Sequence, residues 1–320
     1  MRAALVLAGY ALVVAWFLPR PLARLTGQGA SVRPGLAAWL SALLSAAVSA
    51  VIGLQFLIRT AIAGWPRLSE VVCRSVAGSA CTRAVYGSAA FELGVGAIAM
   101  AATAVALVVA WRCGRRAQRA RRHTRAHAEA ARLIGKALPG TEALVLTDPR
   151  PIAYCVPGRP AAIVLTSGVL EVLEPAQLDA VLAHERAHLA RRHPVLVSLT
   201  RGLAAAVPVV PLFAWARAEV ARLAEMSADD AAIRVSGRTA VITALIAIGT
   251  GAAVRDDSIA RAPAAVPRAA IGAAGYAVPA RLERMVAPPG PARQAWYSLA
   301  LVGLLAGMLV LPGVLAMLAG

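Results

Sequence analysis

Charged residues are scarce in this chain. Asp, Glu, Lys and Arg make up 15% of its 320 residues, whereas soluble globular proteins carry about 25%. Hydrophobic residues reach 59%, and the mean hydropathy is +0.67. This shortage of charge predicts a membrane protein before any single segment is considered.

Acidic residues are scarcer than basic ones, with 16 Asp and Glu against 33 Lys and Arg and a formal net charge of +17. A basic excess is typical of proteins that bind nucleic acid or an anionic membrane surface. The densest basic run, 112–125, directly follows an apolar segment and has no interleaved aromatic residues to stack on bases. We therefore expect the lipid bilayer as a partner and no nucleic acid.

Four uncharged stretches are candidate membrane spans: 3–18, 36–58, 93–111 and 296–320. The last three are long enough to cross a hydrocarbon core of roughly 30 Å at about 1.5 Å per residue. The first is shorter, and a cleaved signal peptide is its alternative reading. No Ala-x-Ala-like site precedes Pro19 and more spans follow, so we predict a retained helix.

The direction of the spans follows from arginine density. The positive-inside rule places the basic run 112–125 in the cytoplasm. The short first connection has three arginines and no acid, so it lies on the same side, and the connection 59–92 lies outside. Both termini are then extracytoplasmic in a multi-pass plasma-membrane protein. Four tryptophans fall at the predicted cytoplasmic ends of the spans, as an interfacial belt does: Trp16, Trp39, Trp111 and Trp296.

The four cysteines contain no C-x-x-C pair, which argues against a cysteine-based zinc knuckle or ribbon. Cys73 and Cys81 both lie in the predicted external loop. They are either a disulfide formed in an oxidising compartment or two free thiols, and the sequence leaves both open. Cys113 and Cys155 are expected to be cytoplasmic and reduced.

Three regions follow from this pattern. Residues 1–111 form a three-helix membrane region with the loop 59–92, residues 112–293 form a cytoplasmic domain with a linker-rich part at 255–291, and residues 294–320 form the fourth span. Within the domain we predict strands at 144–146, 152–156 and 161–165, the last two paired as a hairpin across a Pro-Gly turn. Helices are predicted at 123–138, 169–173, 176–190, 218–235, 238–248 and 279–286. The apolar segment 195–216 is read as a buried or membrane-surface helix, with a hairpin dipping into the bilayer as the alternative.

The helix at 176–190, which Pro194 is expected to end, contains His184-Glu185-x-x-His188. Histidines four residues apart lie on one helix face, so both imidazoles reach one Zn²⁺, and the glutamate between them is placed to act as a base. His193 is expected to be a surface or capping residue. The extended motif His-Glu-x-x-His-x-x-Gly-x-x-His is not present, because it needs a glycine where Arg191 stands and a histidine where Pro194 stands.

Glu225, on a separate downstream helix, is the better third ligand. Asp229 lies four residues further, on the same face, where it can accept the second N–H of a ligand histidine. A solvated acidic helix face is the simpler reading, but acids are scarce here. We expect one zinc ion per chain, bound by His184, His188 and Glu225, with Glu185 as the base.

Three features of the chain resemble those of a known family. They are Tyr-Cys-Val-Pro-Gly at 154–158 ahead of Ile-Val-Leu-Thr-Ser-Gly at 163–168, the zinc motif at 184–188, and Glu225-x-x-x-Asp229. The family that they resemble is the BlaR/MecR-type integral-membrane zinc metallopeptidases. The resemblance implies a mainly α membrane protein: four transmembrane helices, with an α+β gluzincin-type zinc peptidase domain between the third and fourth. It also implies the same metal ligands and base.

Two departures from that family stand out. Antibiotic-sensing members carry a penicillin-binding domain after the fourth span, and this chain stops at Gly320, so β-lactam sensing through such a domain is not expected. Many gluzincins stabilise the oxyanion with a histidine or tyrosine. No histidine follows Glu225 here, and Arg234 and Tyr276 are the candidates.

The predicted function is zinc-dependent cleavage of a cytoplasmic protein in signal transduction, either a transcriptional repressor or the chain itself. One alternative is membrane-protein quality control, as in the heat-shock and prenyl-protein zinc proteases. The other is a non-catalytic signalling protein with a structural or empty zinc site. The sequence leaves open whether the chain forms a homodimer.

Overall fold

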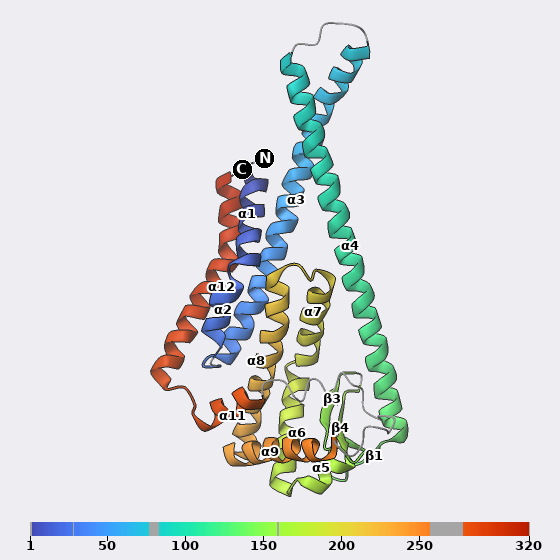
Figure 1. Cartoon of the computed structure of the whole chain (residues 1–320), viewed down its shortest axis with the longest axis vertical. Coiled ribbons are helices and arrows are strands. Elements are labelled where there is room, and N and C mark those ends of the chain that lie inside the picture. The colour runs from blue at the N-terminus through green and yellow to red at the C-terminus, as the bar shows by residue number, and fades with distance from the viewer. Residues whose placement is uncertain (1, 28, 77–82, 159, 257–277, 320) are drawn as a thin grey trace.

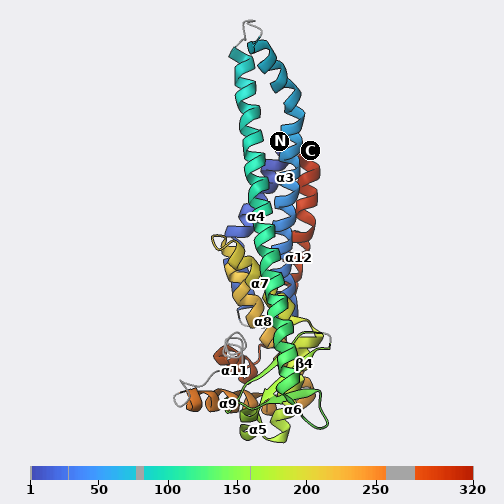
Figure 2. The ribbon, with the colours of Figure 1, turned by 90° about the vertical axis from the view of Figure 1, so that its right-hand side faces the viewer.

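The computed structural model describes residues 2–27, 29–76, 83–158, 160–256 and 278–319. Long helices form one end of the molecule, and a small sheet wrapped in shorter helices forms the other (Figures 1 and 2). The start of α1 and the end of α12 lie side by side, away from the sheet (Figure 1).

Within the described parts of the chain, three helices hold segments long and apolar enough to cross a membrane. These segments are Val32–Thr60 in α3 (Val32–Val76), Leu93–Ile134 in α4 (Arg83–Ile134) and Pro291–Leu318 in α12 (Pro291–Ala319). A fourth candidate is the pair α1 (Arg2–Trp16) and α2 (Pro19–Thr26), bent by 45°. The break falls where Pro19 begins α2, because proline is favoured in the first turn of a helix.

Two expectations about these helices are wrong. The predicted loop 59–92 is mostly helical, since α3 continues to Val76 and α4 begins at Arg83. The predicted separate helix 123–138 is the end of α4, which runs unbroken for 52 residues and stops at Ile134. Gly135, the next residue, approaches the Ala131 carbonyl so closely that a Cβ at this position would collide with it. The chain then enters the first strand.

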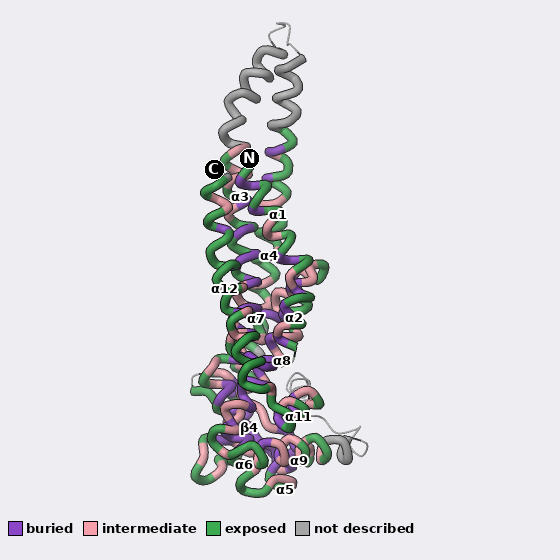
Figure 3. The backbone as a smooth tube through the Cα atoms, turned by 90° about the vertical axis from the view of Figure 1, so that its left-hand side faces the viewer, coloured by how far each residue is buried: buried purple, intermediate pink, exposed green. Residues whose placement is uncertain are grey.

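One tryptophan of the expected interfacial belt is buried inside the protein instead. Trp16, Trp111 and Trp296 are exposed, as interfacial residues would be, whereas Trp39 is fully buried. Trp39 belongs to a core that joins α1, α2, α3 and α12 to α8 (Pro211–Ser236). Figure 3 shows exposed residues dominating α12 and buried residues gathering around β4 and α6.

The sheet has four strands in the order β1-β2-β4-β3. The strands are β1 (Lys136–Ala137), β2 (Ala143–Leu146), β3 (Ala153–Val156) and β4 (Ala162–Thr166). The β3–β4 hairpin is antiparallel, as predicted, and β2 pairs with β4 in parallel. Strand β1 was not predicted, because two exposed residues carry no alternating pattern.

Successive side chains of β4 point to opposite faces of the sheet. Ile163 and Leu165 pack toward α6 (Pro175–Ala190) and α9 (Arg238–Asp256), whereas Val164 packs against the end of α4. The short α5 (Ser167–Val172) follows β4, and α11 (Val278–Val286) packs beside α6, α8 and α9. The membrane helix α4 therefore forms one layer of the sheet domain.

The apolar segment 195–216 is neither one helix nor one span. It contains most of α7 (His193–Ala206) and the first turns of α8, joined around Val207–Val210. Pro194 does not end α6, which stops at Ala190. Arg192 adopts a left-handed φ of 54°, and Pro194 lies in the first turn of α7.

Candidate active site

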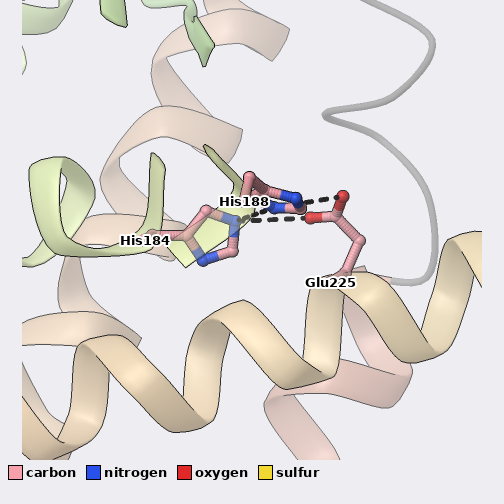
Figure 4. A group of neighbouring side chains, drawn as sticks. All are labelled: His184, His188 and Glu225. Carbon is pink, nitrogen blue, oxygen red and sulfur yellow. Dashed lines mark hydrogen bonds and ion pairs between the residues drawn. The ribbon is translucent and has the colours of Figure 1, made fainter. Parts of the chain in front are cut away.

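Three potential metal ligands converge between α6 and α8 (Figure 4). His184 and His188 project from one face of α6, whose start is secured by Pro175 and by a capping box between Glu174 and Gln177. Helix α8 crosses α6 and brings Glu225 to the same point. The residues predicted as ligands are thus brought together by two helices.

The ligand atoms have the spacing that one zinc ion requires. The two Nε2 atoms are 3.0 Å apart, and the two Glu225 oxygens lie 3.4 Å from His184 Nε2 and 3.6 Å from His188 Nε2. Tetrahedral zinc with bonds of roughly 2.0–2.1 Å separates its ligand atoms by roughly 3.3 Å. Two imidazoles and one carboxylate also match the ligand chemistry of catalytic zinc, so this set of residues fits the metal.

Asp229 orients His184. Its Oδ1 lies 3.1 Å from His184 Nδ1, so this nitrogen donates its proton to the carboxylate and Nε2 keeps its lone pair for a metal. Burial alone would lower the pKa of His184 in the metal-free protein. The Asp229 and Glu225 carboxylates outweigh burial and raise that pKa to about 10.

Arg281 is a site residue that the sequence analysis missed. It extends from α11, is 5% exposed, and donates two hydrogen bonds to Asp229 at 2.6 and 2.7 Å. Another of its nitrogens lies 3.3 Å from Glu225. Although burial disfavours the charged form of Asp229, the Arg281 hydrogen bonds hold the pKa of Asp229 well below its usual range. The short helix 279–286 was predicted, but nothing distinguishes Arg281 among 33 basic residues.

His193 is not a surface residue, contrary to the prediction. It is 2% exposed, and its Nδ1 lies 3.1 Å from His188 Nδ1. Burial lowers the pKa of His193 to about 4 and that of His188 to about 3, so both rings are neutral near pH 7. His193 Nδ1 can then accept the His188 Nδ1 proton, which leaves His188 Nε2 free for a metal.

Glu185 lies on the side of α6 that faces strand β3. Burial raises the pKa of Glu185, and its carboxylate is hydrogen-bonded to the Cys155 thiol. Burial and the neighbouring Glu185 in turn raise the pKa of Cys155, so this free thiol stays protonated. A buried carboxyl with a raised pKa is suited to exchange protons near neutral pH.

The candidates for oxyanion stabilisation are not supported. Arg234 is exposed and lies outside the active-site cleft. Tyr276 lies outside the described residues. Cys81 also lies outside them, so the predicted alternatives of a Cys73–Cys81 disulfide or two free thiols stay open. Among described side chains, Arg281 is a cation that contacts the metal-ligand set directly.

The site opens into a cleft of about 640 Å³. Its lining includes aliphatic residues of α6 and α9, among them Val181, Val241 and Ile248. Further lining residues come from β3, α4 and α7. The His127 ring of α4 lies 2.7 Å from the Tyr154 hydroxyl of β3, which ties the long membrane helix to the strand beside the site.

Taken together, the apolar helices, the small sheet domain and the His-His-Glu cluster define a membrane protein with a metallopeptidase-type site. The particular family is indicated by sequence comparison. Residues 115–216 match "Peptidase family M48", a family of zinc metallopeptidases. This segment contains His184, Glu185 and His188 and ends before Glu225.

A curated relative supports the same class. A "Protease HtpX homolog" of Acidiphilium cryptum (strain JF-5) is 35% identical over 86 residues, which are 26% of this chain. The chain spans 30% of the length of this relative. No solved structure matches the chain. The comparisons support an M48-type metallopeptidase, and the finer resemblance to BlaR/MecR-type peptidases stays a prediction.

Proposed function

We propose that this protein is a membrane-bound zinc endopeptidase that hydrolyses a peptide bond of a cytoplasmic protein segment. The observation that carries the proposal is the convergence of His184, His188 and Glu225 with a buried glutamate, Glu185, one residue after the first ligand. A purely structural zinc site uses four protein ligands, whereas three leave a position for water and substrate.

The chain's own residues divide the work. Zinc, when bound, supplies Lewis acidity toward the scissile carbonyl and lowers the pKa of water. Glu185 takes a proton from the attacking water and returns it to the leaving amine. Asp229 and His193 hold the two ligand rings in the tautomer that leaves Nε2 unprotonated. The positive charge of Arg281 offsets the negative charges of Asp229 and Glu225, both of which it contacts.

An extended substrate is expected to pair with β3. The strand that contains Ile163, β4, is not available for such pairing, because it lies inside the sheet between β2 and β3. Strand β3 is at the edge, and an edge strand can add a further strand through backbone hydrogen bonds. Because Cys155 of β3 contacts Glu185, a segment paired there would run past the base.

Two biological roles remain as proposals. Signal transduction through cleavage of a repressor rests on the resemblance to BlaR/MecR-type peptidases. Quality control of membrane proteins is favoured by the similarity to a protein named as a protease HtpX homologue. The third reading, a non-catalytic protein, is opposed by the open ligand position and the buried base.

The test compares Glu185→Gln with Asp179→Asn, which removes a carboxylate from an exposed position on the same helix. We expect zinc content near one per chain in both variants. Cleavage of an unfolded protein substrate should be abolished only by Glu185→Gln. Zinc-free purified protein, or unchanged cleavage by Glu185→Gln, would contradict the proposal. Comparing cleaved cytoplasmic proteins in cells carrying wild type or Glu185→Gln then separates the two biological roles.

A further inference from the structure

A second, polar pocket of about 190 Å³ lies where the membrane helices meet the peptidase domain. Its lining comes from the start of α3, the C-terminal end of α6, α8, α11 and the start of α12. Four arginines line it, together with one carboxylate, Asp230: Arg33, Arg191, Arg234 and Arg284. This pocket is separate from the cleft that holds the metal ligands.

The positive charge of this pocket is not balanced from within. Asp230 is engaged by Arg284, at 2.8 and 3.0 Å. Among the described residues, Arg33, Arg191 and Arg234 form no ion pair. Arg191 donates instead to the carbonyl and hydroxyl oxygens of Ser227. Burial, followed by the charges of Arg33 and Arg234, lowers the pKa of Arg191, and the nearby Asp230 offsets this only in part, so Arg33 and Arg234 each repel Arg191.

The neutral lining residues add hydrogen-bonding groups. Ser31 donates to the Gln294 carbonyl at 3.0 Å, and its hydroxyl lies 2.8 Å from that of Ser298. These contacts hold the residue before α3 to the first turns of α12 beside the pocket.

The pocket lies at the boundary between apolar and polar parts of the molecule. The candidate spans Val32–Thr60 and Pro291–Leu318 begin at its edge. Trp296, in the same turn as Gln294 and Ser298, is 61% exposed, as a residue at a lipid–water interface would be. Phosphates of membrane lipids occupy this level of a bilayer.

We propose that this pocket binds a phosphate group, with the headgroup of an anionic membrane lipid as its source. Guanidinium groups bind phosphate oxygens in a bidentate manner and are less strongly hydrated than ammonium groups, which suits a cluster of arginines. A bound phosphate would offset the repulsion of Arg191 by Arg33 and Arg234.

Phosphate binding in this pocket would affect the metal site, because lining residues of the pocket lie close in sequence to residues of that site. Arg191 follows His188 by three residues, Ser227 follows Glu225 by two, and Arg284 follows Arg281 by three. A phosphate held by Arg33 of α3 and by Arg191 and Arg234 would therefore connect a membrane helix to α6 and α8, which carry the metal ligands. We expect the bound lipid to stabilise the domain against the membrane helices.

The test uses the full-length protein in detergent, titrated with phosphatidylglycerol or phosphatidylcholine and followed by native mass spectrometry. Wild type should bind phosphatidylglycerol in preference. Arg33→Gln and Arg234→Gln should each weaken that binding about tenfold, the loss expected for one charge-assisted hydrogen bond. Both residues are exposed and form no ion pair, so folding should survive, and unchanged zinc content checks this.

Lys136→Gln is the control. It removes one positive charge from an exposed position on β1, outside the pocket. Equal weakening by Lys136→Gln would show general attraction of the anionic lipid to basic charge and overturn the site, as would unchanged binding in the Arg33→Gln/Arg234→Gln double variant. Competition by inorganic phosphate would support the pocket with free phosphate as its ligand. Selective lipid binding without such competition would identify the headgroup.

Discussion

His193 Nδ1 lies 3.1 Å from His188 Nδ1, at the junction of α6 and α7. This contact gives His188 a partner for its second nitrogen, as Asp229 does for His184. A neighbouring side chain therefore sets the tautomer of each ligand ring. It is a carboxylate for His184 and an imidazole for His188. Groups that orient metal ligands in this way affect metal affinity by about 10- to 100-fold.

We therefore predict that His193→Ala weakens zinc binding by about 10- to 100-fold, measured by competition with a chelator. His193→Asn, which restores an acceptor, should recover part of the affinity. His127→Ala is the control, because His127 lines the same cleft but contacts Tyr154 rather than a metal ligand. Equal losses in the two alanine variants would remove His193 from its positioning role.

Arg281 should be required for the stability of the site. Removing one partner of a buried ion pair leaves the other charge uncompensated and typically costs about 3–5 kcal/mol. Arg281→Met should lower the free energy of unfolding by about that amount, measured by denaturant titration in detergent. The Arg281→Met/Asp229→Asn double variant should be less destabilised than the sum of the single variants. Strict additivity would show that the two side chains do not interact.

The stability of the chelated, metal-free protein should be greatest near pH 6.5. Folding lowers the pKa of His188 from 6.5 to about 3, so its contribution is present above pH 6.5 and is lost as pH falls toward 3. Folding raises the pKa of His184 from 6.5 to about 10, so its contribution is present below pH 6.5 and is lost as pH rises toward 10. Thermal midpoints measured across this range with a chelator check both limbs.

Zinc provides the control for this pH profile. A metal bound at Nε2 replaces the proton there, so the alkaline loss assigned to His184 should disappear in the loaded protein. If the alkaline loss persisted with zinc bound, a group other than His184 would be responsible.

The tip of the α7–α8 hairpin should lie within the lipid. Residues 202–216 carry no charge and are flanked by Arg201 and Arg217. Leu212 and Ala216 share a buried core with Ala42 and Leu43 of the candidate span in α3. Helices with an apolar tip and basic flanks enter the boundary between headgroups and acyl chains.

Two single-cysteine variants, made after the native cysteines are replaced, measure this depth. Val209, at the tip, is 77% exposed, and Val235, near the other end of α8, is 74% exposed. A water-soluble maleimide should label Val235→Cys quickly and Val209→Cys slowly in nanodiscs. Equally fast labelling of both positions would place the tip in water.

The sequence alone was sufficient to predict features that depend on residues close together in the chain. The i, i+4 spacing of His184 and His188 directs both rings to one side whatever surrounds the helix, because helical geometry requires it. The β3–β4 hairpin followed from the Pro-Gly turn at 157–158 and the strand propensities beside it. The long uncharged stretches predicted membrane helices, since a bilayer requires about 20 apolar residues in a row.

Tertiary structure decided what depends on helices separated by long stretches of chain. Arg281 lies 52 residues beyond Asp229, and only the packing of α11 against α6, α8 and α9 turns one of many arginines into the partner of a buried carboxylate. His193 looked like the end of a helix, but the left-handed Arg192 turns the chain so that its ring meets His188. Sequence spacing determines which side chains share one helix, whereas the crossing of helices determines which buried charges and ring nitrogens meet.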